Sequence, residues 1–358
     1  MALRDVIGQD RVITMLLGTL QQGRVSSSYL FTGESGVGKR VTALNLAKAI
    51  NCLSRSDEPC SIGCVKEGRK SYLLNGQPLQ GDACDVCRSC RKIDGGAHPD
   101  VKVITPEKGE IRVEEIREIE ASLSFRPYEG RKKIVIVDDA DLMNPSASNA
   151  FLKTLEEPPE ESHLILISPS PDKLLETIRS RCTRVRFKPL PRGDCIRVIE
   201  NSITRCSSLP GLERKAPGTL ERQVLILAGL AMGRPGLALS SDPMSERERF
   251  FNRLNNMLKG RGDAWSDRDE MEQWLDNALI FLRDLAVCKI TQDHTLMFNA
   301  DMGNVLDEMC KRVTTTGIIE LHRRLSLLKR EVGFNLNKAI TWNYTASMVK
   351  EMFGGSHA

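Results

Sequence analysis

Two hydrophobic patterns divide this chain into halves. In the first half, short apolar runs rich in β-branched residues alternate with stretches whose apolar positions recur at a helical period, such as Arg40–Asn51. Three of the apolar runs predict buried strands, at Ser28–Thr32, Lys133–Val137 and His163–Ser168. Strands alternating with helices are typical of a parallel sheet. We therefore expect residues 1–189 to form an α/β domain with a mostly parallel sheet.

The second half shows a helical pattern only. From Pro191 onward no run of the buried-strand type occurs, and amphipathic spacing predicts helices within Met271–Ile290 and Gly317–Arg330. Pro and Gly cluster between such stretches, as expected of connections between helices. We expect a small helical lid domain at 190–242 and a larger all-α domain at 243–352.

Composition limits the classes of function. The chain has 358 residues, enough for two or three domains, and its formal charge of 51 − 47 = +4 is mild. Aromatic residues make up 5%, which argues against a surface that stacks bases on exposed rings. No apolar run reaches the ~18 residues of a membrane helix, and Met1–Asp5 lacks the apolar stretch of a signal peptide. We expect a cytoplasmic protein without membrane contact.

A glycine-rich segment between the first predicted strand and helix fits the phosphate-binding loop pattern. Gly33, Gly36 and Gly38 would let backbone N–H groups face a phosphate, and Lys39 would reach the β- and γ-phosphates. The last position of the pattern requires a Ser or Thr hydroxyl for Mg²⁺, and here it is Arg40. A guanidinium repels a cation, so nucleotide binding is expected to be weak or absent. A chance glycine-rich turn is the alternative.

The predicted strand Lys133–Val137 ends in two carboxylates, Asp138 and Asp139. At such a strand end the first acidic residue would hold Mg²⁺ and the second would activate the attacking water. Many related ATPases carry Glu at the second position, and the shorter Asp139 would lie further from the water, which costs rate. The alternative is that both residues cap the next helix. With Arg40, this makes the chain's own ATPase activity doubtful.

A cluster of cysteines predicts a metal site. Cys84, Cys87 and Cys90 form a C-x₂-C-x₂-C run, and three thiolates so close together favour tetrahedral Zn²⁺. Cys60 and Cys64 lie in a Gly- and Ser-rich insert and compete for the fourth position. A site closed by four thiolates is structural. Clustering without metal is the alternative, and so is a DNA-reading ribbon built on the basic residues around Cys90.

Five motifs, read in order along the chain, carry a resemblance to a known family. They are the phosphate loop, His98–Asp100, Ile111–Arg117, Asn149–Pro159 and Ser180–Cys182. In this order they are similar to the bacterial clamp-loader subunits of DNA polymerase III, which belong to the AAA+ class and include the gamma/tau and delta-prime types. The resemblance covers roughly residues 5–190 closely and the helical remainder loosely.

The resemblance implies an α/β P-loop AAA+ domain, a helical lid and an all-α collar that assembles into a hetero-pentamer with gamma/tau and delta-type subunits. Sliding clamp and primer–template DNA would be reached through that complex. Arg181 would act in trans as an arginine finger on the nucleotide of a neighbouring subunit. The family also places the first zinc ligand at the end of the phosphate-loop helix, which implies Cys52, Cys84, Cys87 and Cys90 as the site.

Two types within the family remain to be distinguished. The gamma/tau type keeps an intact Gly-Lys-Thr in its phosphate loop and an arginine in its lid that senses the γ-phosphate, at the apparent position of Gly236 here. Delta-prime-like chains commonly have a degenerate phosphate loop and keep the finger, as this chain does. We expect a delta-prime-like stator. An active gamma/tau-type ATPase is the first alternative, and a zinc-ribbon DNA-binding protein on an inactive nucleotide fold is the second.

Overall fold

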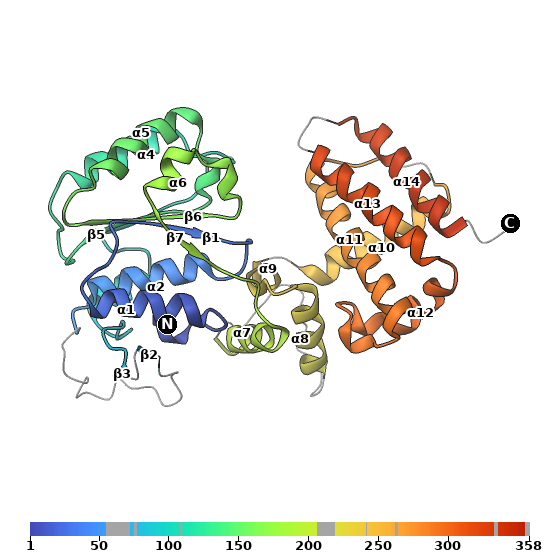
Figure 1. Ribbon diagram of the computed structural model, residues 1–358, viewed down its shortest axis with the longest axis horizontal. Coiled ribbons are helices and arrows are strands. Elements are labelled where there is room, and N and C mark those ends of the chain that lie inside the picture. Colours follow the sequence, from blue (N-terminus) through green and yellow to red (C-terminus); the bar gives the residue numbers. More distant parts are fainter. Residues whose placement is uncertain are drawn as a thin grey trace. The chain divides into compact units, whose positions relative to one another are not determined.

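The structure is a computed structural model and forms two compact units (Figure 1). The first unit comprises Met1–Val198 with Arg234–Gly236, and the second comprises Ile199–Gly233 with Leu237–Ala358. The residues that the structure describes are 1–54, 72–74, 77–107, 109–205, 219–240, 242–261, 264–332 and 336–354.

The first unit contains a five-stranded sheet in the order β4-β5-β6-β1-β7, and every neighbouring pair is parallel. The strands are β1 (Ser28–Thr32), β4 (Val101–Ile104), β5 (Lys133–Val137), β6 (Ser162–Ser168) and β7 (Thr183–Arg186). The three strands expected from apolar runs are confirmed as β1, β5 and β6, the centre of the sheet. The prediction of an α/β domain with a parallel sheet is therefore confirmed.

Helices cover both faces of this sheet (Figure 1). On one face lie α1 (Asp10–Gln21) and α2 (Lys39–Asn51), and on the other lie α4 (Val113–Leu123), α5 (Pro145–Glu156) and α6 (Glu176–Ser180). The apolar side of α4 and α5 packs on the central strands in one buried cluster. Burial of apolar surface on both faces explains why the central strands read as continuous apolar runs.

Shorter elements complete the first unit. They are η1 (Leu3–Asp5), β2 (Leu73–Leu74), β3 (Gln77–Pro78), α3 (Arg88–Asp94), η2 (Ala140–Leu142), η3 (Pro171–Lys173) and the start of α7 (Arg192–Arg205). The strands β2 and β3 pair antiparallel. The helix α3 packs against α2, so it lies beside the phosphate-loop helix.

The second unit contains helices and connecting turns, and no strand occurs among its described residues. Its elements are α8 (Thr219–Leu230), α9 (Pro235–Ser240), α10 (Pro243–Leu258), α11 (Arg268–Thr291), η4 (His294–Leu296), η5 (Ala300–Met302), α12 (Gly303–Lys311), α13 (Thr315–Glu331) and α14 (Lys338–Gly354). Its core buries Trp265, Trp274 and Trp342, so these residues pack as core side chains. No helix among the described residues is both long and apolar enough to cross a bilayer. The boundaries between lid and collar remain a prediction.

Candidate nucleotide and metal sites

The phosphate loop connects β1 to α2 and keeps the backbone that phosphate binding requires. Gly33, Gly36 and Gly38 have φ values of 138°, 81° and 97°, a region that favours glycine. A Cβ on Gly33 would stand 2.5 Å from the carbonyl oxygen of Phe187, so only glycine fits at the start of this loop. Lys39 follows as the first residue of α2. The sequence prediction of strand, loop, lysine and helix in this order is met.

The ammonium group of Lys39 lies inside the loop. Its Nζ donates to the carbonyl oxygens of Gly33 at 2.5 Å and Glu34 at 2.7 Å, and the side chain is buried. Burial lowers the pKa of Lys39, although the carboxylates of Asp139 and Asp138 act in the opposite direction. The lysine therefore has loop carbonyls as partners before any anion arrives.

Arg40 and Asp138 form an ion pair across the mouth of the loop. The Nη1 of Arg40 lies 3.2 Å from Oδ2 of Asp138. The carboxylate that would hold Mg²⁺ thus already has a cationic partner. Thr42 cannot replace the missing hydroxyl, because its Oγ1 donates to the carbonyl oxygen of Gly38 at 2.9 Å and the side chain is buried in α2. The residues present fit a phosphate group and do not fit its magnesium ion.

Asp139 occupies a strained position beside this pair. Its φ is 47°, and burial raises its pKa, with repulsion from Asp138 and Asp141 adding to the effect. The side chain of Asp139 makes no capping hydrogen bond to the following η2, and α5 is capped by Asn144 instead. Capping of the next helix therefore does not explain Asp139. Asp141 is engaged elsewhere, since it accepts from Ser168 Oγ at 2.7 Å.

A short segment from the second half of the chain lies on the phosphate loop. Within the first unit, the backbone N–H of Gly236 donates to the carbonyl oxygen of Gly36 at 2.9 Å. A Cβ on Gly236 would stand 2.8 Å from Cα of Gly36, so this approach needs glycine. Arg234 reaches Glu34 of the loop at 3.6 Å. Sequence reasoning identified the missing lid arginine at Gly236 but gave no sign of this contact.

Arg181 lies at the C-terminal end of α6, directly before β7. Its side chain is 36% exposed, and its Nη2 contacts Oε1 of Glu156 at 2.6 Å. Its Nη1 donates to the carbonyl oxygen of Thr177 at 3.0 Å. Glu156 ends α5. The sequence did not indicate Glu156 as a partner, because the two residues lie on different elements and pair only once α5 and α6 pack together.

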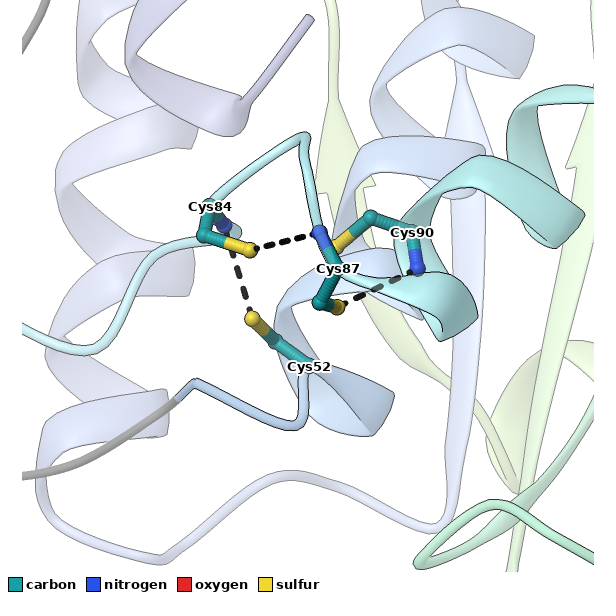
Figure 2. A group of neighbouring side chains, drawn as sticks. All are labelled: Cys52, Cys84, Cys87 and Cys90. Atoms are coloured by element: carbon teal, nitrogen blue, oxygen red, sulfur yellow. Dashed lines mark hydrogen bonds between the residues drawn. The ribbon is translucent and has the colours of Figure 1, made fainter. Parts of the chain in front are cut away.

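Four cysteine side chains converge beside α2 (Figure 2). The sulfur atoms of Cys52, Cys84, Cys87 and Cys90 all lie within 4.8 Å of one another. Cys52 follows the last residue of α2, Cys84 and Cys87 lie in the turn before α3, and Cys90 lies in α3. This group can hold a metal ion. Cys60 and Cys64, the competing candidates, lie outside the described residues.

The local backbone is arranged around these sulfurs. Backbone N–H groups donate to the sulfurs, from Cys84 to Cys52 at 3.4 Å, from Cys87 to Cys84 at 3.3 Å and from Cys90 to Cys87 at 3.5 Å. A hydrogen bond from the thiol of Cys90 lowers the pKa of Cys52 to about 5. Thiolates are the form that binds metal, so the surroundings already favour one thiolate in the group.

Lys48 ties the cysteine turn to the phosphate-loop helix, and sequence reasoning missed it. This lysine of α2 is fully buried, and its Nζ contacts Asp85 at 2.8 Å and Asp94 at 2.9 Å. Burial alone would lower the pKa of Lys48, but the bonds to the two carboxylates raise it above its ordinary value. A buried lysine with paired carboxylates is charged and costly to unpair, so the cysteine turn and α2 are held together.

Asp100 of the His98–Asp100 motif anchors the loop before β5. Its carboxylate accepts backbone N–H groups of Tyr128 at 2.7 Å, Glu129 at 2.8 Å and Gly130 at 2.7 Å. His98 is buried, and its Nδ1 accepts the backbone N–H of Asp100 at 3.1 Å. The motif recognised in the sequence is therefore a structural one in this fold.

Comparison with known proteins adds a second line of observation. A family model described as "DNA polymerase III, delta subunit" matches residues 8–70 and 65–191. The chain is 34% identical over 356 residues to DNA polymerase III subunit delta' of Bacillus subtilis, covering 96% of each protein. It is also 34% identical over 322 residues to the subunit delta' of Pseudomonas aeruginosa, covering 87% of this chain and 86% of that protein.

Relatives of another class match less of this chain than these two delta' proteins do. DNA polymerase III subunit tau of Escherichia coli is 34% identical over 186 residues, which cover 52% of this chain and 25% of that protein. The similarity to the two delta' proteins therefore extends through the helical half, while the similarity to tau covers about half of this chain.

Proposed function

Because this chain belongs to the family of DNA polymerase III delta' subunits, we propose that it serves a clamp-loading complex as a stator that supplies an arginine finger without hydrolysing ATP itself. The observation that carries the proposal is the ion pair of Arg40 with Asp138 at 3.2 Å. The cationic Arg40 stands where a hydroxyl would bind Mg²⁺. It also pairs with Asp138, the carboxylate expected to bind the same ion. The full-length similarity to delta' proteins supports the same assignment over an active gamma/tau-type ATPase.

In the proposed mechanism the chain works on a neighbour's nucleotide. The partners are gamma/tau and delta-type subunits of a hetero-pentamer, and sliding clamp and primer–template DNA are reached through that complex. Arg181, exposed at the end of α6, would extend to the nucleotide bound by the neighbouring subunit and stabilise charge that develops in its transition state. An arginine finger contributes ~10³–10⁵ in rate. Phosphate contacts through Gly33, Gly36, Gly38 and Lys39 would retain at most weak nucleotide binding.

We further propose that the ion held by the four cysteines is Zn²⁺ in a structural role. Four thiolates fill a tetrahedral shell and leave no position for substrate. The site joins the end of α2 to α3 and so holds the helix that carries Lys39. The zinc-ribbon alternative is not favoured, because two of the basic residues beside the site share one acidic partner: Lys92 lies 2.6 Å and Arg88 4.0 Å from the carboxylate of Glu129.

The decisive test replaces the finger in the assembled complex. We expect Arg181→Ala to lower ATP hydrolysis at the one active site that it faces at least about 10-fold, because only this site loses its transition-state charge. The DNA-stimulated ATPase rate of the whole complex should fall by that site's share. Pentamer formation, measured by size-exclusion chromatography with light scattering, should be unchanged. Arg179→Ala, two residues away, is the matched control and should keep full activity. An Arg181→Ala complex with normal ATPase activity would refute the trans role.

A further inference from the structure

The second unit contains a cluster of three metal-ligating side chains that plays no part in the proposed function. Cys288 lies in α11, His294 in η4 and Asp307 in α12. One ligand atom from each lies within 4.8 Å of the other two. These residues are far in sequence from the four cysteines, and they belong to a separate compact unit.

The three side chains already point at one another. The Sγ of Cys288 donates to Oδ1 of Asp307 at 3.1 Å, and the Nε2 of His294 lies 3.1 Å from the same oxygen. The fold also makes room for the imidazole, because a Cβ on Gly303 would stand 2.4 Å from Nδ1 of His294. A side chain at position 303 would therefore displace the His294 ring from the cluster.

A second thiol, that of Cys310, lies near this group but is not part of it. Cys310 lies three residues after Asp307 on α12, and its Sγ donates to the carbonyl oxygen of Leu285 at 3.4 Å. It is not among the ligand atoms that lie within 4.8 Å of one another. The cluster therefore offers one thiol, one imidazole and one carboxylate.

The donor set selects among metal ions. Thiol and imidazole ligands suit Zn²⁺ and similar transition ions, whereas Mg²⁺ and Ca²⁺ require oxygen ligands. Side-chain exposures of 39% for His294 and 45% for Asp307 give an ion a path from solvent, while Cys288 is buried. The site would thus have its thiol on the protein side and its imidazole and carboxylate on the solvent side, so an ion could enter from solvent.

We propose that Cys288, His294 and Asp307 bind a divalent transition ion of the zinc type, with a water molecule as the fourth ligand. Binding replaces the thiol proton of Cys288 and the hydrogen bonds to Asp307 by metal bonds and releases that proton to solvent. The ion joins α11 to α12 across the η4–η5 connection. Its role is structural, since it links these helices of the second unit.

The test measures zinc per chain in the full-length protein. Wild type and variants are purified under a thiol reductant, equilibrated with zinc, dialysed and analysed by elemental mass spectrometry. Asp307→Asn and His294→Ala should each hold about one equivalent less than their matched controls, because each removes one ligand. The controls are Glu308→Gln, next to Asp307, and His322→Ala, an exposed histidine on α13. The four-cysteine site contributes equally to all of these proteins.

Equal zinc content in variants and controls would overturn the proposal. Cobalt titration of the wild type decides the question even if a variant fails to fold. Two equivalents with distinct spectra are expected, one of four-thiolate type and one with weaker thiolate-to-cobalt bands from a mixed ligand set. A single equivalent of four-thiolate type would also overturn it. If the four cysteines bound no metal, the equivalent at the second site would still be expected. The two sites are therefore tested separately.

Discussion

At the scale of single residues, the pair of Arg40 and Asp138 changes the charge of the phosphate site. An exposed ion pair adds about 0–1 kcal/mol to stability, so the pair contributes little to folding. Its effect is on ligands, because a cation at this place repels Mg²⁺ and occupies a carboxylate. The two residues are 98 positions apart in the sequence. They meet because the strands that precede them belong to the same sheet.

We predict that Arg40→Thr makes nucleotide binding depend on magnesium. The substitution frees Asp138 and supplies a hydroxyl, so Mg²⁺ should strengthen ATP binding about 10-fold, equal to about 1.4 kcal/mol, while it should leave the wild type unchanged. Isothermal titration calorimetry with and without Mg²⁺ measures this. Val41→Thr is the matched control, because it places a hydroxyl one residue further along α2. Magnesium-dependent binding by the wild type, or ATP turnover at motor rates, would contradict the proposed role of Arg40.

At the scale of elements, loops are fixed by single buried side chains that receive several backbone donors. Asp100 holds the 128–130 segment in this way, and Asn51 at the end of α2 accepts the N–H groups of Arg131 and Lys132, both at 2.9 Å. The loop before β5 is therefore fixed over residues 128–132. Burial raises the pKa of Asp100, but the three backbone donors outweigh this and hold its pKa below the ordinary value.

We predict that Asp100→Asn destabilises the first unit by about 1–3 kcal/mol at neutral pH, because an amide accepts fewer of the three hydrogen bonds. A carboxylate with a lowered folded-state pKa stabilises the protein above its unfolded pKa of 3.8. The stabilisation is lost as pH falls through the folded-state pKa. Urea unfolding at pH 7 and in the acid range should show the difference between wild type and variant shrinking with acid. Asp172→Asn, at an exposed site, should show no difference at either pH.

The elements also show what the sequence can and cannot predict. The strands β1, β5 and β6 were found because both of their faces are buried and their residues are apolar. The outer strand β7 was missed because three of its four residues are exposed. The glycines, Lys39 and the run Cys84, Cys87 and Cys90 follow local spacing rules and were found, whereas Cys52 was implied by the family resemblance. The partners Glu156 and Lys48 act through contacts between distant segments, which no local pattern encodes. Asp100 was indicated as part of a motif, but its hydrogen bonds to the 128–130 segment were not.

At the scale of the whole molecule, each unit has a core of its own. Apolar residues of the sheet and its helices form one cluster, and the helices from α10 to α14 form another around the buried tryptophans. Metal sites are proposed in both units, the four-cysteine site in the first and the mixed site in the second. Loss of either ion should therefore act on its own unit first.

We predict that Cys87→Ser destabilises the first unit alone. Removing a residue that only supports a metal ligand already weakens metal binding. Losing a ligand itself should therefore cost at least about 100-fold in metal affinity, or about 2.7 kcal/mol. A loss of that size lowers Tm by roughly 5–11 °C in a unit of this size. Hydrogen exchange should rise in α2 and α3 and stay constant in α11 to α13. Val86→Ser, an exposed neighbour, is the control, and equal exchange in both variants would show that the site does not stabilise the unit.

The contact of Gly236 with Gly36 limits what can be rebuilt at this site. Even a Cβ at position 236 would stand 2.8 Å from Cα of Gly36, so any side chain there has to break the contact between the two glycines. A single Arg40→Thr substitution frees Asp138 but leaves position 236 a glycine, so it restores a magnesium ligand and no lid arginine. Rebuilding both therefore takes at least two substitutions and a shift of the 234–236 segment.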